Sequence, residues 1–490
     1  MIDQEAASGE QLRDGLEPDV YPVPEGRWQR LEHTDVWRSM FRHPQLDTPR
    51  GRALQGFSNV FLHVYPVKVP RRVLRLRYSW RLGFIATVLF WILVVTGVYL
   101  MFFYTPSVTA AYGDMQQLRT GIGFGQLIRN VHRWSAHLMV LVVVLHLVRV
   151  FFAGAYKKPR EFNWLVGILL LAVTLGFSFT GYLLPWDQLS YWAVTVGTNL
   201  VSYVPIFGGI LTDLLIGGPQ IGQPTLQRFY ALHVAVLPLL LALFLMVHIW
   251  RVRKDGFAVR RGAVGAFAEG ANELLDGDVG ETALGDTAPG ETPGVNDGTT
   301  DGATDAATDA ATMPATMPAA TALALAKGDR VRLLGVVDRE SVTAEERLTD
   351  DTVFAWPHLI VRHVVVALGT IATVLALGVA FAAPLRDIAN PNLTPEPAKA
   401  PWYFVGLQEL LSHFDPLIAG IFVPAGVLLT LAFLPYFDKN PRTESKYRKV
   451  AISVFSTILV IAVVLTVIGA LFRGPGWKFV PPWQHSYLEM

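Results

Sequence analysis

Seven long apolar segments restrict what this chain can fold into. Each is about 20 residues long, the length that a helix needs to cross the ~30 Å hydrocarbon core of a bilayer. The segments are Leu82–Tyr104, His132–Ala155, Trp164–Leu184, Phe229–Trp250, Leu359–Phe381, Leu417–Phe437 and Val450–Phe472. Charged residues make up 17% of the chain, against about 25% in soluble domains. The sequence therefore predicts an all-α polytopic membrane protein.

Four histidines on two of these segments form two pairs. His132 and His146 are 14 residues apart, and His233 and His248 are 15 apart. At ~100° per residue, each spacing returns to nearly the same helix face, within about 40° and 60° respectively. On two antiparallel helices, His132 would face His233 and His146 would face His248, at depths roughly 21–23 Å apart. Because two facing imidazoles suit a six-coordinate haem iron, the pattern predicts two stacked haems.

A histidine inside a membrane can also be structural. Four of them paired in depth on two antiparallel spans are hard to explain in that way, because polar groups in lipid are costly and usually functional. His137 differs from these four, since it lies five residues after His132, about 140° round the helix. We interpret His137 as a structural residue or a neighbour of a quinone, and not as an iron ligand.

Glycines repeat the 14-residue spacing on the two flanking segments. Gly83 and Gly97 lie on the first span, and Gly167 and Gly181 lie on the third. Glycine lets a bulky group approach the backbone closely. These glycines are predicted to mark where haem edges contact the helices, with ordinary helix packing as the alternative.

Arginines adjoin the same histidines. The four are Arg129, Arg133, Arg149 and Arg228. Guanidinium groups bind carboxylates in a two-pronged geometry, so these side chains are predicted to contact the anionic haem propionates. The alternative is that they reach from the helix ends towards water.

The distribution of basic residues predicts the orientation of the spans. Lys and Arg are concentrated before the first span and in the connections near 157–160, 251–261 and 439–449, whereas residues 187–227 contain neither. By the positive-inside rule, the N-terminus and these three connections are cytoplasmic. His132 and His233 then lie on the outer side of the membrane, and His146 and His248 on the inner side.

Composition divides the chain into four predicted parts. Residues 1–70 form a polar extension, 71–261 a four-helix di-haem module, and 328–490 a module of three further transmembrane helices. Residues 262–327 are rich in Ala, Gly, Asp and Thr, and such a segment is predicted to be a disordered cytoplasmic linker. The chain has no cysteine, which excludes disulfides, thiolate metal sites, cysteine-ligated iron–sulfur clusters and thioether-bound haem.

The segment Asn390–Leu411 reads NPNLTPEPAKAPWYFVGLQELL and lies outside by the predicted topology. It opens with prolines and is predicted to continue into an amphipathic helix that starts near Trp402. The alternative is a simple external loop. A rigid, aromatic-rich segment at the outer membrane surface also suits a pocket for a lipophilic ring.

Four segments carry a family resemblance: IRNVHRWSAHLMVLVVVLHLVRV, GAYKKPREFNWLVG, TGYLLPWDQLSYWAV and LQRFYALHVAVLPLLLALFLMVHIWRVRKDG. They resemble cytochrome b of the cytochrome bc complexes, over most of residues 75–260 and again over about 355–482. The 15-residue histidine spacing and the PWDQ motif resemble the plastid-type branch, in which the two helical modules are separate chains. Here the modules are fused. The stretch Trp192–Leu200 instead resembles the mitochondrial and proteobacterial branch.

The resemblance implies the core subunit of a quinol:cytochrome c oxidoreductase, or of one with an equivalent acceptor. In such a Q cycle, coupled to proton translocation, quinol is oxidised at an outer site. One electron leaves through a Rieske-type iron–sulfur protein towards a c-type cytochrome or equivalent acceptor. The other electron crosses two b-type haems and reduces quinone at an inner site. The resemblance assigns His132 and His233 to the outer, low-potential haem, and His146 and His248 to the inner one.

The same resemblance carries expectations about surroundings and partners. It implies a homodimeric complex in an energy-coupling plasma membrane, in contact with lipid, and it implies no nucleic-acid partner. The family's quinol-site signature Pro-Glu-Trp-Tyr is matched here by Ala400 followed by Pro401, Trp402 and Tyr403, and the last three are expected at the outer quinol site. The glutamate thought to accept a quinol proton is absent, which leaves Glu409 and Asp187 as candidate acceptors.

Arg81 is a second departure from the family pattern. The plastid-type branch attaches an extra haem through a cysteine two residues before the first glycine of the first span, and that position is Arg81 here. Arginine cannot form a thioether, so no covalent c-type haem is predicted. Arg81 is expected to face a haem propionate or an inner-site quinone instead.

Two other functions compete with this one. A di-haem membrane anchor of another quinone-linked dehydrogenase would hold two haems, but it does not account for the PWDQ and APWY motifs or for the last three spans. A transporter that relays protons through intramembrane histidines predicts no haem and no pairing of histidines in depth.

Overall fold

The computed structural model describes residue 34 and residues 63–258, 352–395, 399–440, 442–473 and 478–479. Contacts divide the chain into two units, Met1–Phe257 with Asp351–Met490, and Ala258–Asp350. The predicted linker, 262–327, lies outside the described residues, as does nearly all of the predicted extension, 1–70. The described helices of both predicted modules belong to the first unit.

Seven helical runs among the described residues are long and apolar enough to cross a membrane. They are α7 (Leu82–Met101), α9 (Gly125–Ala153), α10 (Glu161–Leu183), Gln223–Asp255, α18 (Ala355–Ala380), Leu417–Phe437 and α21 (Lys449–Leu471). The predicted all-α architecture with seven spans is confirmed. One helix, α9, starts seven residues before the predicted segment, because polar residues such as Arg129 and Asn130 bond to the end of α18 and the loop after it and continue the helix.

Two of the spans contain a π-helical segment. The run Gln223–Asp255 consists of α13 (Gln223–Ala231), the π-helical η2 (Leu232–Val236) and α14 (Leu237–Asp255); the run Leu417–Phe437 consists of the π-helical η6 (Leu417–Phe422) and α20 (Val423–Phe437). A proline follows each π segment, Pro238 and Pro424. Proline lacks an N–H and crowds the carbonyl four residues before it, which a wider π turn tolerates. In the first run, the π segment contains His233 and precedes His248.

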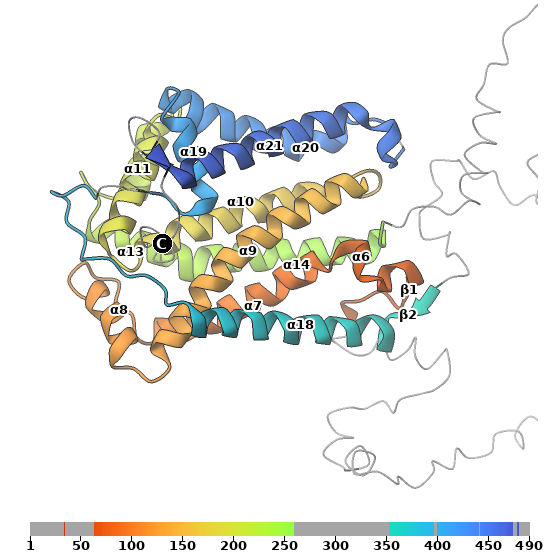
Figure 1. The fold of residues 1–490 in the computed structure, drawn as a ribbon, viewed down its shortest axis with the longest axis horizontal. Coiled ribbons are helices and arrows are strands. Elements are labelled where there is room, and N and C mark those ends of the chain that lie inside the picture. The colour runs from red at the N-terminus through yellow and green to blue at the C-terminus, as the bar shows by residue number, and fades with distance from the viewer. Residues whose placement is uncertain are drawn as a thin grey trace, which may run out of the picture. The chain divides into compact units, whose positions relative to one another are not determined.

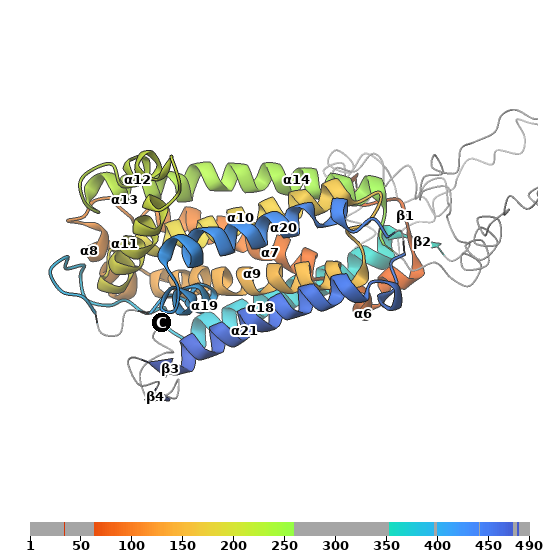
Figure 2. The ribbon, with the colours of Figure 1, turned by 90° about the horizontal axis from the view of Figure 1, so that it is seen from above.

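The spanning helices lie side by side in the first unit (Figures 1 and 2). Contacts join α7 to α9 and α10 to α14, while α18 packs against α7 and α9 and α20 packs against α10. The core shared by α7, α9, α10 and α14 is apolar and includes the buried side chains Leu89, Phe90, Met139, Val142 and Leu241. The four helices of the predicted haem module therefore enclose a dry interior.

Short helices gather at one end of the bundle, together with α13 (Figures 1 and 2). They are α8 (Ala111–Thr120), α11 (Gln188–Ser202), α12 (Gly208–Ile216) and α19 (Trp402–Leu411). Asp187 starts α11 with a capping box, in which its carboxylate accepts from the Ser190 backbone N–H at 2.9 Å and the Ser190 hydroxyl accepts from the Asp187 N–H at 3.2 Å. Pro401 precedes α19, so the predicted helix starting near Trp402 is confirmed.

The other end of the bundle carries small polar elements (Figure 1). Strand β1 (Lys68–Pro70) pairs antiparallel with β2 (Thr352–Phe354), and η1 (Arg71–Leu74) and α6 (Leu76–Ser79) lead into α7. The segment before the first span is thereby joined to the segment before α18. A short turn, η7 (Ser445–Tyr447), precedes α21. Strands β3 (Phe472–Arg473) and β4 (Lys478–Phe479) follow α21, pair with each other, and lie at the opposite end of the bundle, near α19 (Figure 2).

A buried ionic cluster joins the α9–α10 turn to the connection between α20 and α21. Lys157 lies 2.9 Å from Asp438 Oδ2, and the Tyr156 hydroxyl donates to the same oxygen at 2.5 Å. Arg448 donates to the Tyr156 hydroxyl at 2.8 Å. Burial alone would raise the pKa of Asp438, but hydrogen bonds from Tyr156 and Lys157 and the charges of Lys157 and Arg448 outweigh it and hold that pKa below its usual value.

Replacing Asp438 with alanine is expected to lower the unfolding free energy by about 3 kcal/mol, because Lys157 and Arg448 would stay buried without their anion. The depressed pKa adds a pH dependence: the carboxylate stabilises the wild type above the ordinary aspartate pKa, and this stabilisation is lost as pH falls through the folded-state pKa. Thermal unfolding in detergent, from neutral pH into acid, measures both effects. Glu444→Ala is the control, since Glu444 pairs with Lys446 on the exposed surface at 3.2 Å, where ion pairs contribute little. Equal melting temperatures for the two variants would contradict this role.

Candidate functional site

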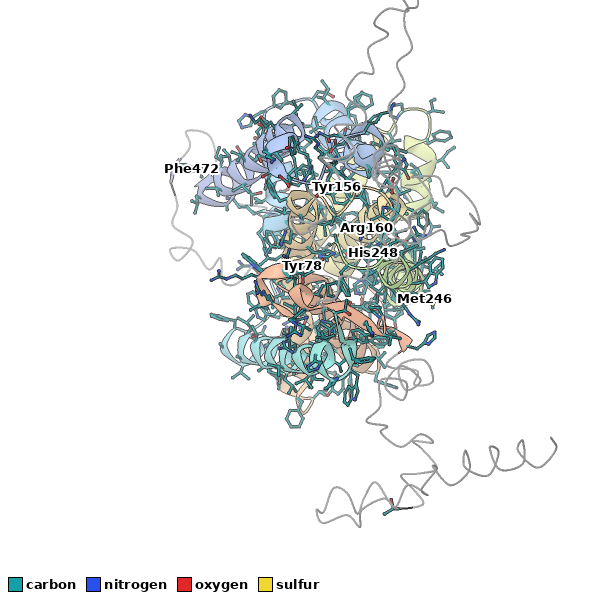
Figure 3. The ribbon with its side chains drawn as sticks, turned by 90° about the vertical axis from the view of Figure 1, so that its right-hand side faces the viewer. Tyr78, Tyr156, Arg160, Met246, His248 and Phe472 are labelled. Carbon is teal, nitrogen blue, oxygen red and sulfur yellow. The ribbon has the colours of Figure 1, made fainter. Side chains whose placement is uncertain are left out.

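Four histidines face each other in two pairs inside the bundle. His132 of α9 and His233 of η2 have ring centroids 6.4 Å apart, with ring planes at 67°. His146 of α9 and His248 of α14 have ring centroids 6.4 Å apart, with planes at 80°. Figure 3 labels His248, with Tyr78, Tyr156 and Arg160 in the same view along the bundle. The pairs are those expected from the sequence.

The spacing of each pair fits one iron atom. A metal–imidazole bond is about 2.0 Å long and a ring nitrogen lies about 1.1 Å from its ring centroid, so two axial rings have centroids roughly 6.2 Å apart. Both observed separations are 6.4 Å. Among the described residues, no group of three or more His, Cys, Asp or Glu side chains could hold a metal ion. Two imidazoles alone suit haem iron, because the porphyrin supplies the other four ligands.

Each of the four predicted glycines lies against one of these histidines. A Cβ atom at Gly83 would lie 3.1 Å from His146 Cε1, one at Gly97 3.4 Å from His132 Cε1, and one at Gly167 3.6 Å from His248 Cε1. A Cβ atom at Gly181 would overlap the ring of His233. Contact with haem edges stays a prediction; in the structure, the lack of a side chain at Gly83 and Gly181 makes room for the imidazole rings.

Two threonines, not predicted from the sequence, hold the imidazoles of one pair. The Thr96 hydroxyl lies 2.9 Å from His132 Nδ1 and donates to the Ile92 carbonyl at 2.7 Å. The Thr180 hydroxyl lies 3.2 Å from His233 Nδ1 and donates to the Gly176 carbonyl at 2.9 Å. A hydroxyl has one proton to donate, so in both cases the histidine Nδ1–H is the donor and Nε2 keeps a free lone pair. The repeated Thr-Gly dipeptide, at 96–97 and 180–181, is the sequence signal for these residues.

The four predicted propionate-binding arginines have different surroundings. Arg129 donates to the carbonyls of Ala383 and Pro384 at 2.6 and 2.5 Å. Arg149 donates to the Tyr78 carbonyl, and Arg228 to two carbonyls at the end of α12, 2.7 and 2.5 Å away. In Arg133, by contrast, Nε is buried without a hydrogen-bond partner among the described residues. Of these four, Arg133 is the one whose guanidinium has a buried N–H with no acceptor.

Arg81 lies just before α7 at the end of the bundle that carries β1 and β2. It is 5% exposed, its backbone is left-handed (φ 53°), and Nη2 donates to the Leu74 carbonyl at 3.1 Å. Burial and the nearby Arg362 both lower the pKa of Arg81. Near it, the Tyr65 hydroxyl and His363 Nδ1 are 2.9 Å apart, and the His363 ring stacks on Phe84 at 4.1 Å. A buried cation beside a second cation is a suitable place for an anionic group.

The predicted outer segment contacts α9. Trp402 Nε1 donates to His137 Nδ1 at 3.0 Å, and the Tyr403 and His137 ring centroids are 5.7 Å apart. Before the helix, Lys399 donates to the carbonyls of Gly469, Ala470 and Phe472 at the end of α21. Lysine at a helix C-terminus satisfies free carbonyls and complements the helix dipole. These contacts hold Trp402 and Tyr403 beside α9, and Lys399 against the end of α21.

The two candidate proton acceptors lie in different environments. Asp187 is 8% exposed, and besides capping α11 it accepts from the Arg386 backbone N–H at 3.1 Å. It lines a cavity of about 20 Å³ together with Arg133, Tyr182 and Arg386, which is room for about one water molecule. Glu409 of α19 instead lies 3.0 Å from His413 Nε2, one turn further along the helix.

Comparison with known proteins agrees with this architecture. Residues 68–256 match the family model described as Cytochrome b/b6/petB, and residues 388–483 match the one described as Cytochrome b(C-terminal)/b6/petD. Over 177 residues, the chain is 47% identical to cytochrome b6 of Synechococcus sp. (strain RCC307) and 46% identical to that of Prochlorococcus marinus (strain NATL1A). Each match covers 36% of this chain and 81% of the relative.

The fold also matches a solved structure. A chain described as "Hyperthermophilic respiratory Complex III" superposes with a TM-score of 0.61 at 21% identity, and the match covers 91% of this chain and 92% of that one. The two family models together cover more than half of the chain, in the order N-terminal part, then C-terminal part. This chain therefore belongs to the cytochrome b/b6 family of membrane proteins, which bind haem b and carry electrons as redox subunits of cytochrome bc complexes.

Proposed function

We propose that this chain is the core cytochrome b subunit of a quinol:cytochrome c oxidoreductase, or of one with an equivalent acceptor. It oxidises quinol at an outer site and passes electrons across the membrane to an inner quinone site, in a Q cycle coupled to proton translocation. The observation that carries the proposal is the two histidine pairs, each spaced for one iron and backed by glycines. His132 and His233 hold the outer b haem, and His146 and His248 hold the inner one.

Each bound haem supplies a one-electron carrier. The chain's own residues would hold two irons, each through two imidazoles, and Thr96 and Thr180 keep the outer imidazoles in the tautomer that presents Nε2. Such hydrogen bonds to the far nitrogen orient a ligating histidine and increase its basicity. The apolar core of α7, α9, α10 and α14 excludes water from the site.

The proposed orientation follows from the positive-inside rule. The basic residues around η1, after α9, after α14 and before α21 lie on the cytoplasmic side, with the N-terminus. The end with α8, α11, α12 and α19 then faces outward, in an energy-coupling plasma membrane. The quinol site formed by Pro401, Trp402 and Tyr403 lies at this outer end.

Arg133 and Arg81 are the proposed propionate partners. Arg133 has an unpaired buried N–H at the outer end, and Arg81 is a buried cation beside Arg362 at the inner end. Arg129, Arg149 and Arg228 already donate to backbone carbonyls, so they are weaker candidates for binding a propionate. Since residue 81 is not a cysteine, no covalent c-type haem is proposed.

Asp187 is better placed than Glu409 to accept the outer proton. It shares a small polar cavity with Arg133, Tyr182 and Arg386, and a water there could connect its carboxylate to the quinol site. Glu409 is paired with His413. Neither residue occupies the position of the glutamate in the family signature.

Partner subunits must supply the remaining redox centres. Without cysteine, this chain cannot hold a conventional iron–sulfur cluster or a thioether-bound haem. The proposed complex therefore contains a Rieske-type iron–sulfur protein and a c-type cytochrome or an equivalent acceptor, and it is a homodimer.

The Thr180 hydroxyl is expected to tune the outer haem. Thr180→Val keeps the shape of the side chain but removes the acceptor for His233 Nδ1–H, so the imidazole becomes a weaker donor to ferric iron. A hydrogen bond of about 1 kcal/mol corresponds to roughly 40 mV for a one-electron couple. The low-potential haem is expected to shift upward by about this amount in a redox titration, with both haems retained.

The matched control is Thr174→Val on the same helix. Thr174 is buried and donates to the Leu170 carbonyl at 2.8 Å, and among the described residues it makes no hydrogen bond to a histidine. The midpoint potentials of both haems in Thr174→Val should equal those of the wild type. Equal shifts in both variants, or a shift confined to the higher-potential haem, would contradict the assigned role of Thr180.

Two measurements on the purified complex test the proposed function. Pyridine haemochrome quantitation with a redox titration should give two b-type haems per chain at distinct potentials and no c-type haem on this chain. Steady-state assays should show quinol-dependent reduction of cytochrome c or of another one-electron acceptor. Two haems without quinol oxidation would favour a membrane anchor of another dehydrogenase, and no haem at all would favour a transporter.

A further inference from the structure

His137 is the histidine that connects α9 to the outer quinol segment. Its Nδ1 accepts a hydrogen bond from Trp402 Nε1 at 3.0 Å, and its ring lies 5.7 Å from that of Tyr403 and 5.6 Å from that of Trp134. Neither aromatic residue of the outer segment is a titratable base at neutral pH. The signature position that carries a carboxylate in the family holds Pro401 here.

The hydrogen bond from Trp402 determines where the proton of His137 lies. An indole N–H can only donate, so His137 Nδ1 must be the acceptor and carry no proton. The neutral ring therefore has its proton on Nε2. No described residue is a hydrogen-bond partner of this Nε2–H, although the ring is partly buried. The outer segment thus orients a free N–H donor beside its own aromatic side chains.

We propose that His137 Nε2–H donates a hydrogen bond to a ring oxygen of the quinol at the outer site. The inference rests on the proposed quinol oxidation. The bond strengthens as the quinol hydroxyl loses its proton, because the oxygen then becomes negative, and donors aimed at developing negative charge lower the barrier. His137 keeps its own proton throughout; the quinol proton goes to the proposed acceptor Asp187, and the two electrons go to the iron–sulfur partner and the outer haem.

The charged and titratable groups around His137 favour this role. Arg133 lies one turn before it on α9, and its positive charge acts on His137. Tyr403 of α19 packs against the ring and is a neutral phenol at ordinary pH. No carboxylate is among the groups that act on His137. Positive charge and a free N–H together favour an oxygen that becomes negative.

Two substitutions of His137 separate this role from a purely structural one. His137→Asn keeps an oxygen near the position of Nδ1, so Trp402 retains its acceptor, but no atom reaches the position of Nε2. His137→Gln places an amide N–H near the position of Nε2 and loses the acceptor for Trp402. If His137 only links α9 to α19, the enzyme needs the acceptor for Trp402, which His137→Asn keeps. If His137 donates to quinol, the enzyme needs the N–H at the Nε2 position, which His137→Gln keeps.

The test uses the whole complex with decylubiquinol and menadiol as substrates. His137→Asn is expected to lower kcat/KM by about tenfold, the loss of roughly one hydrogen bond in the transition state. His137→Gln should recover part of this loss. Haem content and both midpoint potentials should be unchanged in each variant. The control is His358→Asn, the same substitution at an exposed position of α18.

The outcomes distinguish this inference from the proposed function. If the wild type oxidises both quinols and His137→Asn equals it, the hydrogen-bond assignment is overturned. It is also overturned if His137→Gln is impaired and His137→Asn is not, since the ring would then serve only to hold Trp402. A wild-type complex that contains both haems but oxidises neither quinol would overturn the proposed function, and this inference with it.

Discussion

Replacing His248 with alanine is expected to remove one haem, the inner one, and to leave the outer haem in place. His248 faces His146 with ring centroids 6.4 Å apart, and these two side chains would hold the inner haem, so His146 alone would bind it too weakly to retain it. The other pair, His132 and His233, lies elsewhere along the helices and is not changed by this substitution, so the outer haem should keep both of its proposed ligands. Haemochrome quantitation should fall from two b haems per chain to one, and the higher-potential step should disappear from the redox titration.

Variants of the facing histidine make this test sharper. His146→Ala should lose the same haem as His248→Ala, and the double variant should lose no more, because both side chains are proposed ligands of one iron and their effects are then not additive. His132→Ala should lose the other haem. Retention of two intact b haems in His248→Ala would refute the ligand assignment. His358→Ala, at an exposed position of α18, should retain both haems.

Replacing Gly181 with valine is expected to remove the outer haem alone. Even a Cβ atom at Gly181 would overlap the ring of His233, so a branched side chain must displace the imidazole or push α10 away. Either movement separates His233 from the position in which it faces His132. Haem content should fall to one per chain, with the higher-potential haem left. Gly181→Ala should cause a smaller loss, since the clash is smaller.

The matched control for this variant is Gly176→Ala on the same helix. A Cβ atom at Gly176 would lie 3.8 Å from the side chain of Leu237, an ordinary packing distance. Haem content and both potentials should remain those of the wild type. If Gly181→Val keeps both haems at unchanged potentials, the glycine does not make room for the ligand.

The spans and the histidine partners could be predicted because their signals are local. A run of about 20 apolar residues must be helical in a bilayer, since no water can satisfy its backbone groups. Antiparallel neighbours then determine which histidines share a depth, and the structure has His132 with His233 and His146 with His248. The start of α19 near Trp402 was predictable too, because proline has a φ suited to the N-terminal end of a helix, and Pro401 directly precedes α19.

The alignment of His233 and His248 on one helix face was harder to predict from the sequence. Ideal α-helical periodicity leaves His233 and His248 about 60° apart round the axis. The π-helical segment Leu232–Val236 begins at the residue before His233 and continues towards His248, and a π turn takes up roughly one additional residue. The 15-residue spacing therefore acts as about 14 residues of α-helix, the spacing of His132 and His146. A sequence pattern does not reveal where a helix widens.

By itself, the sequence determined the seven spans, the pairing of the four histidines, the repeated glycines and the lack of cysteine, because each depends on spacing or composition within one segment. Only the tertiary structure decided which side chains meet across segments. In it, Thr96 and Thr180 contact His132 and His233, and Arg129 donates a hydrogen bond to the Ala383 carbonyl. Trp402 donates a hydrogen bond to His137, 265 residues away in the sequence. Such contacts depend on how helices distant in sequence pack, and that packing is set by the whole bundle.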